Sequence, residues 1–224
     1  MIPLLSLAII ITPISNKMAW KITRFWKKTA LALFGVKVKI EYKEAPSQLG
    51  KGGIIVGLNQ QSLLDPTAGY SAWNYHVRSI WNIEYALIPF LGWTSFILGW
   101  VIIRQNPKQS KSQINKASKH AKNGGLVFLS IEGQRSIDGN LCPYKKGPVV
   151  LAIQSQATIH PLYISGSREC LPPGEWKIRP GVITLHFLPP IQTRGLTYQD
   201  RNILLEKVRA IGEREHELWR QKKN

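Results

Sequence analysis

Acidic residues and cysteines are both scarce in this chain of 224 residues. Its two cysteines, Cys142 and Cys170, form no C-x-x-C pair and have no histidine nearby at ligand spacing. This pattern argues against a structural zinc site and against a disulfide framework, and it fits a reducing cytosolic face. We therefore expect no metal site.

The chain also lacks an apolar run long enough for a full membrane span. Residues 2–15 carry no charge, but these fourteen residues include Pro3 and Pro13. A spanning helix needs about twenty residues, so this stretch is too short. No basic region precedes it and no small-residue cleavage site follows it, which argues against a cleaved signal peptide.

A basic stretch with interleaved aromatic residues follows. Five lysines and arginines lie within residues 17–28 with no acid among them, and Trp20, Phe25 and Trp26 lie between them. This composition is typical of a helix at a membrane interface, on the cytoplasmic side by the positive-inside tendency. We expect residues 1–35 to form a membrane-associating segment and residues 36–224 to form the main domain. The alternative is a core helix with a solvated basic face.

Thirty lysines and arginines against thirteen acids give a formal net charge of +17. So large an excess indicates an anionic partner, such as a phosphate, a phospholipid surface or nucleic acid. An apolar fraction of 44% and eight tryptophans argue against a disordered basic tail. Nucleic-acid binding is a remote alternative, because no nucleic-acid fold signature is present.

Short apolar runs alternate with helical patterns along the rest of the chain. Strands are expected at residues 36–42, 54–58, 79–83, 100–103, 126–129, 158–164 and 182–187, and helices at 66–75, 107–122, 147–156 and 198–223. This alternation predicts an α/β fold whose mixed, largely parallel central sheet is flanked by helices.

Two polar segments each follow a buried strand. In the first, which spans residues 59–66, Asp65 and Pro66 read as a helix N-cap followed by proline at the first helical position. Polar groups also gather at this edge of an α/β sheet to form binding sites. Asp65 is therefore either a cap or a site residue.

The second segment spans residues 130–136 and contains Glu132. Here Gly133 permits close backbone approach, and Arg135 offers a planar fork for a phosphate or carboxylate. Residues 144–147 then lead into an apolar helix whose amino end can help to hold an anion. Either segment alone could be an ordinary turn, but together they predict a site.

These segments resemble the ordered motif blocks of the glycerolipid acyltransferases, a family that includes 1-acylglycerol-3-phosphate acyltransferase. The family block Asn-His-x-x-x-x-Asp is similar to residues 59–65, and the second block is similar to residues 84–104. The block Phe-Pro-Glu-Gly-Thr-Arg-Ser, with a later Phe-Lys-x-Gly, resembles residues 130–136 and 144–147. The last, a Val-Pro strand that ends in Gly, resembles residues 160–166.

The resemblance implies roles for the matching residues. Asp65 would orient the side chain at position 60, and the two would form the catalytic pair. The cations that bind the acceptor phosphate would be Arg104, Arg135, Lys145 and Lys146. The pocket would be formed by Asn59, Ser62, Glu132, Gly133, Gln134, Ser136 and Pro161.

Position 60 departs from the family pattern. A family member has a histidine there, the general base that takes a proton from the acceptor hydroxyl as it attacks the acyl thioester. This chain has Gln60, whose amide can accept a hydrogen bond from the hydroxyl and donate one to Asp65. An amide cannot carry a proton away, and general-base catalysis contributes about 10²–10⁴-fold. Slow or absent turnover is therefore expected, unless another base acts, such as His160 or the acceptor's own phosphate.

The resemblance thus predicts a membrane-associated acyltransferase of phospholipid biosynthesis or remodelling. Acyl-CoA or acyl carrier protein would be the co-substrate, with no bound cofactor, and a lysophospholipid such as 1-acylglycerol-3-phosphate would be the acceptor. The alternative is a catalytically inactive family member that binds lipid or acyl-CoA. Further motif changes at Ser130, Ile131 and Gln134 indicate natural divergence rather than a single engineered change.

Overall fold

The structure is a computed structural model that describes residues 16–43, 49, 52–87, 92 and 98–223. The strands are β1 (Val36–Tyr42), β2 (Gly53–Gly57), β3 (Val77–Asn82), β4 (Gly99–Ile102), β5 (Leu126–Ser130), β6 (Ile159–Ser165) and β7 (Gly181–Phe187). The helices are α2 (Asn16–Leu33), α3 (Leu64–Ala72), α4 (Ile83–Ala86), α6 (Pro107–Lys122), α7 (Gly147–Ser155), α8 (Ser167–Cys170) and α9 (Arg201–Lys223), which follows the 3-10 turn η2 (Tyr198–Asp200). Every predicted strand is present, with ends within two residues of those observed.

The strands form one sheet in the order β1-β7-β6-β2-β5-β3-β4. All neighbouring pairs are parallel except β6 and β7, which are antiparallel. The prediction of a mixed, largely parallel sheet is therefore confirmed.

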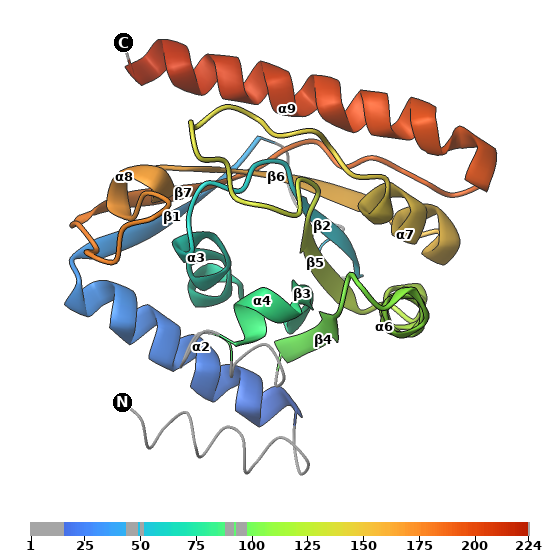
Figure 1. Ribbon diagram of the computed structural model, residues 1–224, viewed down its shortest axis with the longest axis horizontal. Helices are drawn as coiled ribbons and strands as arrows, with labels where there is room; N and C mark the ends of the chain where they lie inside the picture. The colour runs from blue at the N-terminus through green and yellow to red at the C-terminus, as the bar shows by residue number, and fades with distance from the viewer. Residues whose placement is uncertain (1–15, 44–48, 50–51, 88–91, 93–97, 224) are drawn as a thin grey trace.

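Helices cover both faces of this sheet, with α2 and α3 on one side and α6, α7 and α9 on the other (Figure 1). The central strand β2 serves both sides, because successive side chains of a strand point to opposite faces. Ile55 packs in the core beneath α2 and α3, whereas Ile54 and Val56 pack in the core beneath α6, α7 and α9. A strand buried on both faces reads as a continuous apolar run, which is the pattern at residues 54–58.

Helix α2 is amphipathic and packs against α3 and β1. It buries Trp20 and Leu31, and it exposes Lys21, Phe25 and Lys28. None of the helices in the described residues is long and apolar enough to cross a membrane. The apolar stretch predicted at residues 2–15 lies outside the described residues.

The register of β2 and β5 sets the position of the site. These strands are parallel neighbours, and Gly57 pairs with Ser130 at their carboxyl ends. The polar segments at residues 59–66 and 130–136 therefore leave the sheet side by side. Because β3 is parallel to β5 on its other side, its carboxyl end at Asn82 reaches the same edge.

Candidate active site

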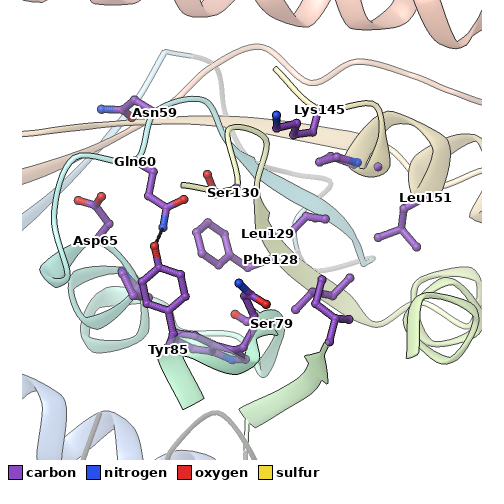
Figure 2. A pocket seen from close by; sticks show the side chains of 18 of the residues that line it. Asn59, Gln60, Asp65, Ser79, Tyr85, Phe128, Leu129, Ser130, Lys145 and Leu151 are labelled. Carbon is purple, nitrogen blue, oxygen red and sulfur yellow. Dashed lines mark hydrogen bonds between the residues drawn. The ribbon is translucent and has the colours of Figure 1, made fainter. Parts of the chain in front are cut away.

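A cavity of about 230 Å³ lies at this edge of the sheet. Its polar lining residues are Asn59, Gln60, Ser62, Asp65, Ser79, Asn82, Tyr85, Arg104, Ser130 and Lys145 (Figure 2). Apolar walls come from β3, β5, α6 and α7, through residues that include Ile80, Phe128, Leu129, Ile114 and Leu151. The cavity thus joins a charged and polar group of side chains to an apolar interior.

Asn59 anchors the first loop to the neighbouring strand β6. Its Nδ2 donates to the Ile164 carbonyl at 2.6 Å, and its Oδ1 accepts from the Ile164 N–H at 2.8 Å. The side chain is buried, so this pair of hydrogen bonds satisfies an amide that would otherwise be desolvated without partners. Asn59 consequently fixes the backbone of the residue that follows it.

The backbone of Gln60 is held on both sides by the second polar segment. Its N–H donates to Glu132 Oε2 at 2.6 Å, and its carbonyl accepts from the Ser136 N–H at 2.8 Å. The side-chain amide turns toward α4, where Nε2 donates to Tyr85 Oη at 3.1 Å (Figure 2). Gln60 Oε1 is buried and has no hydrogen-bond partner among the described residues. The expected hydrogen bond from Gln60 to Asp65 is therefore not formed.

Asp65 is not the N-cap of α3, so the capping interpretation was wrong. The helix begins two residues earlier than predicted, at Leu64, because Leu64 buries its side chain in the core; Pro66 is the third helical residue. Asp65 instead turns back, and its Oδ2 accepts from the N–H groups of Gln61 at 2.8 Å and Ser62 at 3.0 Å.

The second oxygen of Asp65 makes no hydrogen bond of standard geometry, and the Ser167 hydroxyl is the side-chain donor that acts on this carboxyl. Asp65 Oδ1 is buried and has no hydrogen-bond partner in the part of the chain that the structure describes. Burial raises the pKa of the Asp65 carboxyl to about 6, against the opposing effect of its hydrogen bonds and of the Arg135 charge. A buried carboxylate with a free lone pair thus lies in the wall of the cavity.

Glu132 joins the two polar segments from behind the cavity. It is fully buried, and its two oxygens accept from the Gln60 N–H at 2.6 Å and the Cys142 N–H at 2.5 Å. Burial raises the pKa of Glu132 to about 7, although both hydrogen bonds favour the ionised form. Glu132 does not line the cavity, so its contacts assign it to loop architecture.

The cation cluster predicted from the sequence is only partly assembled. Arg104 and Lys145 line the cavity, and Arg104 Nη2 donates to the Gly133 carbonyl. Arg135 and Lys146 do not line it, but the Arg135 charge reaches Asp65 and lowers the pKa of that carboxyl.

The remaining predicted pocket residues divide in the same way. Gly133 and Ser62 line the cavity, whereas Gln134, Ser136 and Pro161 do not. Ser136 is buried and donates to Asp138 Oδ1 at 3.0 Å. Gln134 is exposed, and Pro161 pairs with Val56 inside the sheet.

His160 cannot act as the replacement base from its observed position. Its Nε2 lies 3.4 Å from the Gly52 carbonyl, where β2 begins, whereas Gln60 follows the end of that strand. Sequence reasoning missed Tyr85 and Asn82, and it placed Ser130 in a motif block without assigning it to the pocket; all three line the cavity. The Asn82 amide and Ser130 Oγ are buried without hydrogen-bond partners among the described residues. No described group of three or more His, Cys, Asp or Glu residues is placed to hold a metal ion.

Comparisons with known proteins agree with this architecture. The solved structure of the 1-acyl-sn-glycerophosphate (LPA) acyltransferase PlsC from Thermotoga maritima has a similar fold, with a TM-score of 0.75 and 21% sequence identity, over 96% of this chain and 88% of that one. A 1-acyl-sn-glycerol-3-phosphate acyltransferase of Limnanthes douglasii is 31% identical over 170 residues, which cover 74% of this chain and 58% of that protein.

The protein of the same name from Saccharomyces cerevisiae is 28% identical over 196 residues, which cover 85% of this chain and 63% of that one. The chain therefore spans less than two thirds of the length of these relatives. The family model described as Acyltransferase matches residues 36–165, more than half of the chain. The sheet, the motif segments and this family match agree. The chain therefore belongs to the acyltransferase family of glycerophospholipid metabolism.

Proposed function

We propose that this protein transfers an acyl group from acyl-CoA or acyl carrier protein to the free hydroxyl of a lysophospholipid such as 1-acylglycerol-3-phosphate. The observation that supports this function best is the composition of the cavity. Arg104 and Lys145 supply positive charge, and Gln60 and Asp65 supply free hydrogen-bond acceptors, within one space that has apolar walls.

Each part of such an acceptor has a matching part of the cavity. Its phosphate suits Arg104 and Lys145, which form no ion pair with any described acid. Its hydroxyl suits the free oxygens of Gln60 and Asp65, because a hydroxyl can satisfy a buried acceptor. The acyl chain suits the apolar walls, among them Leu151.

We further propose that the protein works at the cytoplasmic surface of an anionic membrane. The exposed side of α2 carries Phe25 and Leu33 beside Lys21 and Lys28. Apolar side chains flanked by lysines suit an interface where acyl chains meet anionic headgroups. The lipid acceptor would then reach the cavity from the membrane.

A second function is favoured by Gln60 itself. An amide cannot accept a proton at neutral pH, so a member of this family with Gln60 could bind its lipid and thioester without turning them over. That protein would be a lipid or acyl-CoA sensor or carrier rather than a catalyst.

The test is transfer of a labelled acyl group from acyl-CoA to lysophosphatidic acid by the purified protein in mixed micelles. Binding of lysophosphatidic acid is measured in parallel. Arg104→Gln should weaken this binding at least tenfold, whereas Arg194→Gln, an exposed arginine outside the cavity, should leave it unchanged. Equal affinity for a neutral monoacylglycerol would contradict the proposed acceptor. Binding without transfer would favour the non-catalytic function, and binding of nucleic acid alone would overturn both.

A further inference from the structure

The titratable side chains that line the cavity are few. Among the described residues they are Asp65, Tyr85, Arg104 and Lys145, and no histidine is among them. Arg104 and Lys145 are cations at neutral pH, and the oxygen of Tyr85 already accepts the Gln60 amide. Asp65 is therefore the group in this described lining that can take a proton.

The arrangement of Gln60 leaves Asp65, which lines the cavity, without a hydrogen bond from the side chain at position 60. If the side chain at position 60 donated a hydrogen bond to Asp65, it would occupy a lone pair of that carboxylate. Here the Gln60 amide donates to Tyr85 instead, so it does not occupy Asp65 (Figure 2). The backbone N–H groups of Gln61 and Ser62 fix Oδ2, whereas Oδ1 accepts no hydrogen bond of standard geometry among the described residues; the nearby Ser167 hydroxyl can rotate toward the carboxyl or away from it.

Glu132, the other buried carboxylate near the cavity, differs from Asp65 in its hydrogen bonds and in its access to the cavity. Both oxygens of Glu132 accept backbone N–H groups, and the residue lies behind the cavity wall. His160 lies at the opposite end of the sheet. Neither residue combines access to the cavity with a free lone pair.

We propose that Asp65 is itself the general base of this site, in place of the histidine that position 60 lacks. This inference rests on the proposed acyl-transfer function. The acceptor hydroxyl donates to Asp65 Oδ1, and the carboxylate takes the proton as the hydroxyl oxygen forms a bond to the thioester carbonyl carbon. The tetrahedral intermediate collapses, its carbon–sulfur bond breaks, and the proton passes from Asp65 to the departing thiolate. The products are an ester and a thiol.

The electrostatics of the site are compatible with this role. A carboxyl whose pKa is raised to about 6 is a stronger base than an ordinary aspartate, and it is still mostly ionised at pH 7. The ionisable groups whose fields couple to Asp65 are Arg135, Glu132 and Tyr163. Glu132 also titrates near neutral pH, so a pH profile must be combined with substitutions at Asp65 itself.

The experiment compares acyl transfer by the unmodified protein with that of Asp65→Asn, Asp65→Ala and Gln60→His. Asp65→Asn keeps an oxygen for the N–H groups of Gln61 and Ser62 but removes the base, so the rate should fall by about 10²–10⁴-fold. Asp200→Asn makes the same chemical change in η2, outside the cavity, and should leave the rate unchanged. Binding of lysophosphatidic acid should survive in every variant.

Chemical rescue separates a base from a structural carboxylate. Added formate should restore part of the rate of Asp65→Ala, because it can occupy the space of the missing carboxylate. In the unmodified protein kcat/KM should fall as pH drops below about 6. In the rescued variant this fall should shift to lower pH, since formate is a weaker base that stays ionised there.

Three results would overturn the proposal, and they differ in what they say of the proposed function. Full activity in Asp65→Asn would exclude Asp65 as the base while leaving acyl transfer intact. Lipid binding with no transfer until Gln60 becomes histidine would show a preserved pocket that lacks any base. Absence of lipid binding together with inactivity of every variant would refute the acyl-transfer function itself.

Discussion

Replacement of Lys27 by methionine should stabilise this protein at neutral pH. Lys27 lies on the buried side of α2, where its side chain is fully buried. Its Nζ has no hydrogen-bond partner among the described residues and lies 4.6 Å from the centre of the Tyr70 ring and 5.7 Å from that of Trp81. Burial lowers the pKa of Lys27 from 10.5 to about 7, because the low-dielectric interior disfavours the ammonium form.

The magnitude follows from this pKa shift. The folded protein binds fewer protons than the unfolded chain between pH 7 and pH 10.5, so the free energy of unfolding falls as pH drops through this window. At about 1.4 kcal/mol per pKa unit, the destabilisation reaches about 4 kcal/mol at pH 7. Attraction of the ammonium to the two aromatic rings offsets about 1–2 kcal/mol. Lys27→Met should therefore gain about 2–3 kcal/mol at pH 7.

Urea unfolding followed by tryptophan fluorescence measures this gain. At pH 9 the advantage of Lys27→Met should shrink by about 1 kcal/mol, because deprotonating the unfolded lysine costs less at that pH, while the neutral amine no longer gains from the two rings. Lys28→Met, on the exposed side of the same helix, should change stability by less than about 0.5 kcal/mol at either pH. A loss of stability in Lys27→Met, or a gain that does not depend on pH, would refute the reasoning.

Three further substitutions test the loops around the cavity. Asn59→Leu removes both hydrogen bonds to Ile164 and should destabilise the fold by about 2–3 kcal/mol in urea unfolding, whereas an unchanged midpoint would show that the amide is dispensable. The raised pKa of the Glu132 carboxyl should make the free energy of unfolding fall as pH rises from about 4.5 to 7, and Glu132→Gln should reduce this slope in pH-dependent denaturation to the part that Asp65 contributes below about pH 6. Gly133 has a φ of +67°, and a Cβ there would lie 3.3 Å from Arg104 Nη2. Gly133→Ala should therefore cost about 1 kcal/mol and weaken lysophosphatidic acid binding, and unaltered binding by calorimetry would contradict this placement.

Apolar patterning predicted the strands because it records burial directly. The alternation at residues 36–42 marked a strand at the sheet edge, and the uninterrupted run at 54–58 marked one buried on both faces. The start of α3 was misplaced because the dipeptide Asp65-Pro66 has the local pattern of a cap, whereas burial of Leu64 decides where the helix begins. Local pattern competes with tertiary packing, and here packing determines the boundary.

The motif blocks located the cavity but not the orientation of its side chains. Gln60 was evident in the sequence, yet its hydrogen bond joins it to Tyr85, twenty-five residues away in another element. Similarly, Arg135 and Lys146 belong to motif segments but do not line the cavity, because the turn at Gly133 and the start of α7 set where they lie. The spacing of motif residues along the chain does not say where their side chains point or which residue of another element they contact.

The way in which Gln60 is held has an evolutionary consequence. Glu132 and Ser136 contact its backbone N–H and carbonyl, which every residue except proline provides, so the loop does not depend on the identity of the side chain. Glutamine and histidine codons differ only at their third base. A lineage with this loop can therefore exchange an amide for an imidazole by one point mutation, without first evolving a new backbone. The backbone of this loop can therefore hold either a glutamine or a histidine at position 60 as the lineage evolves.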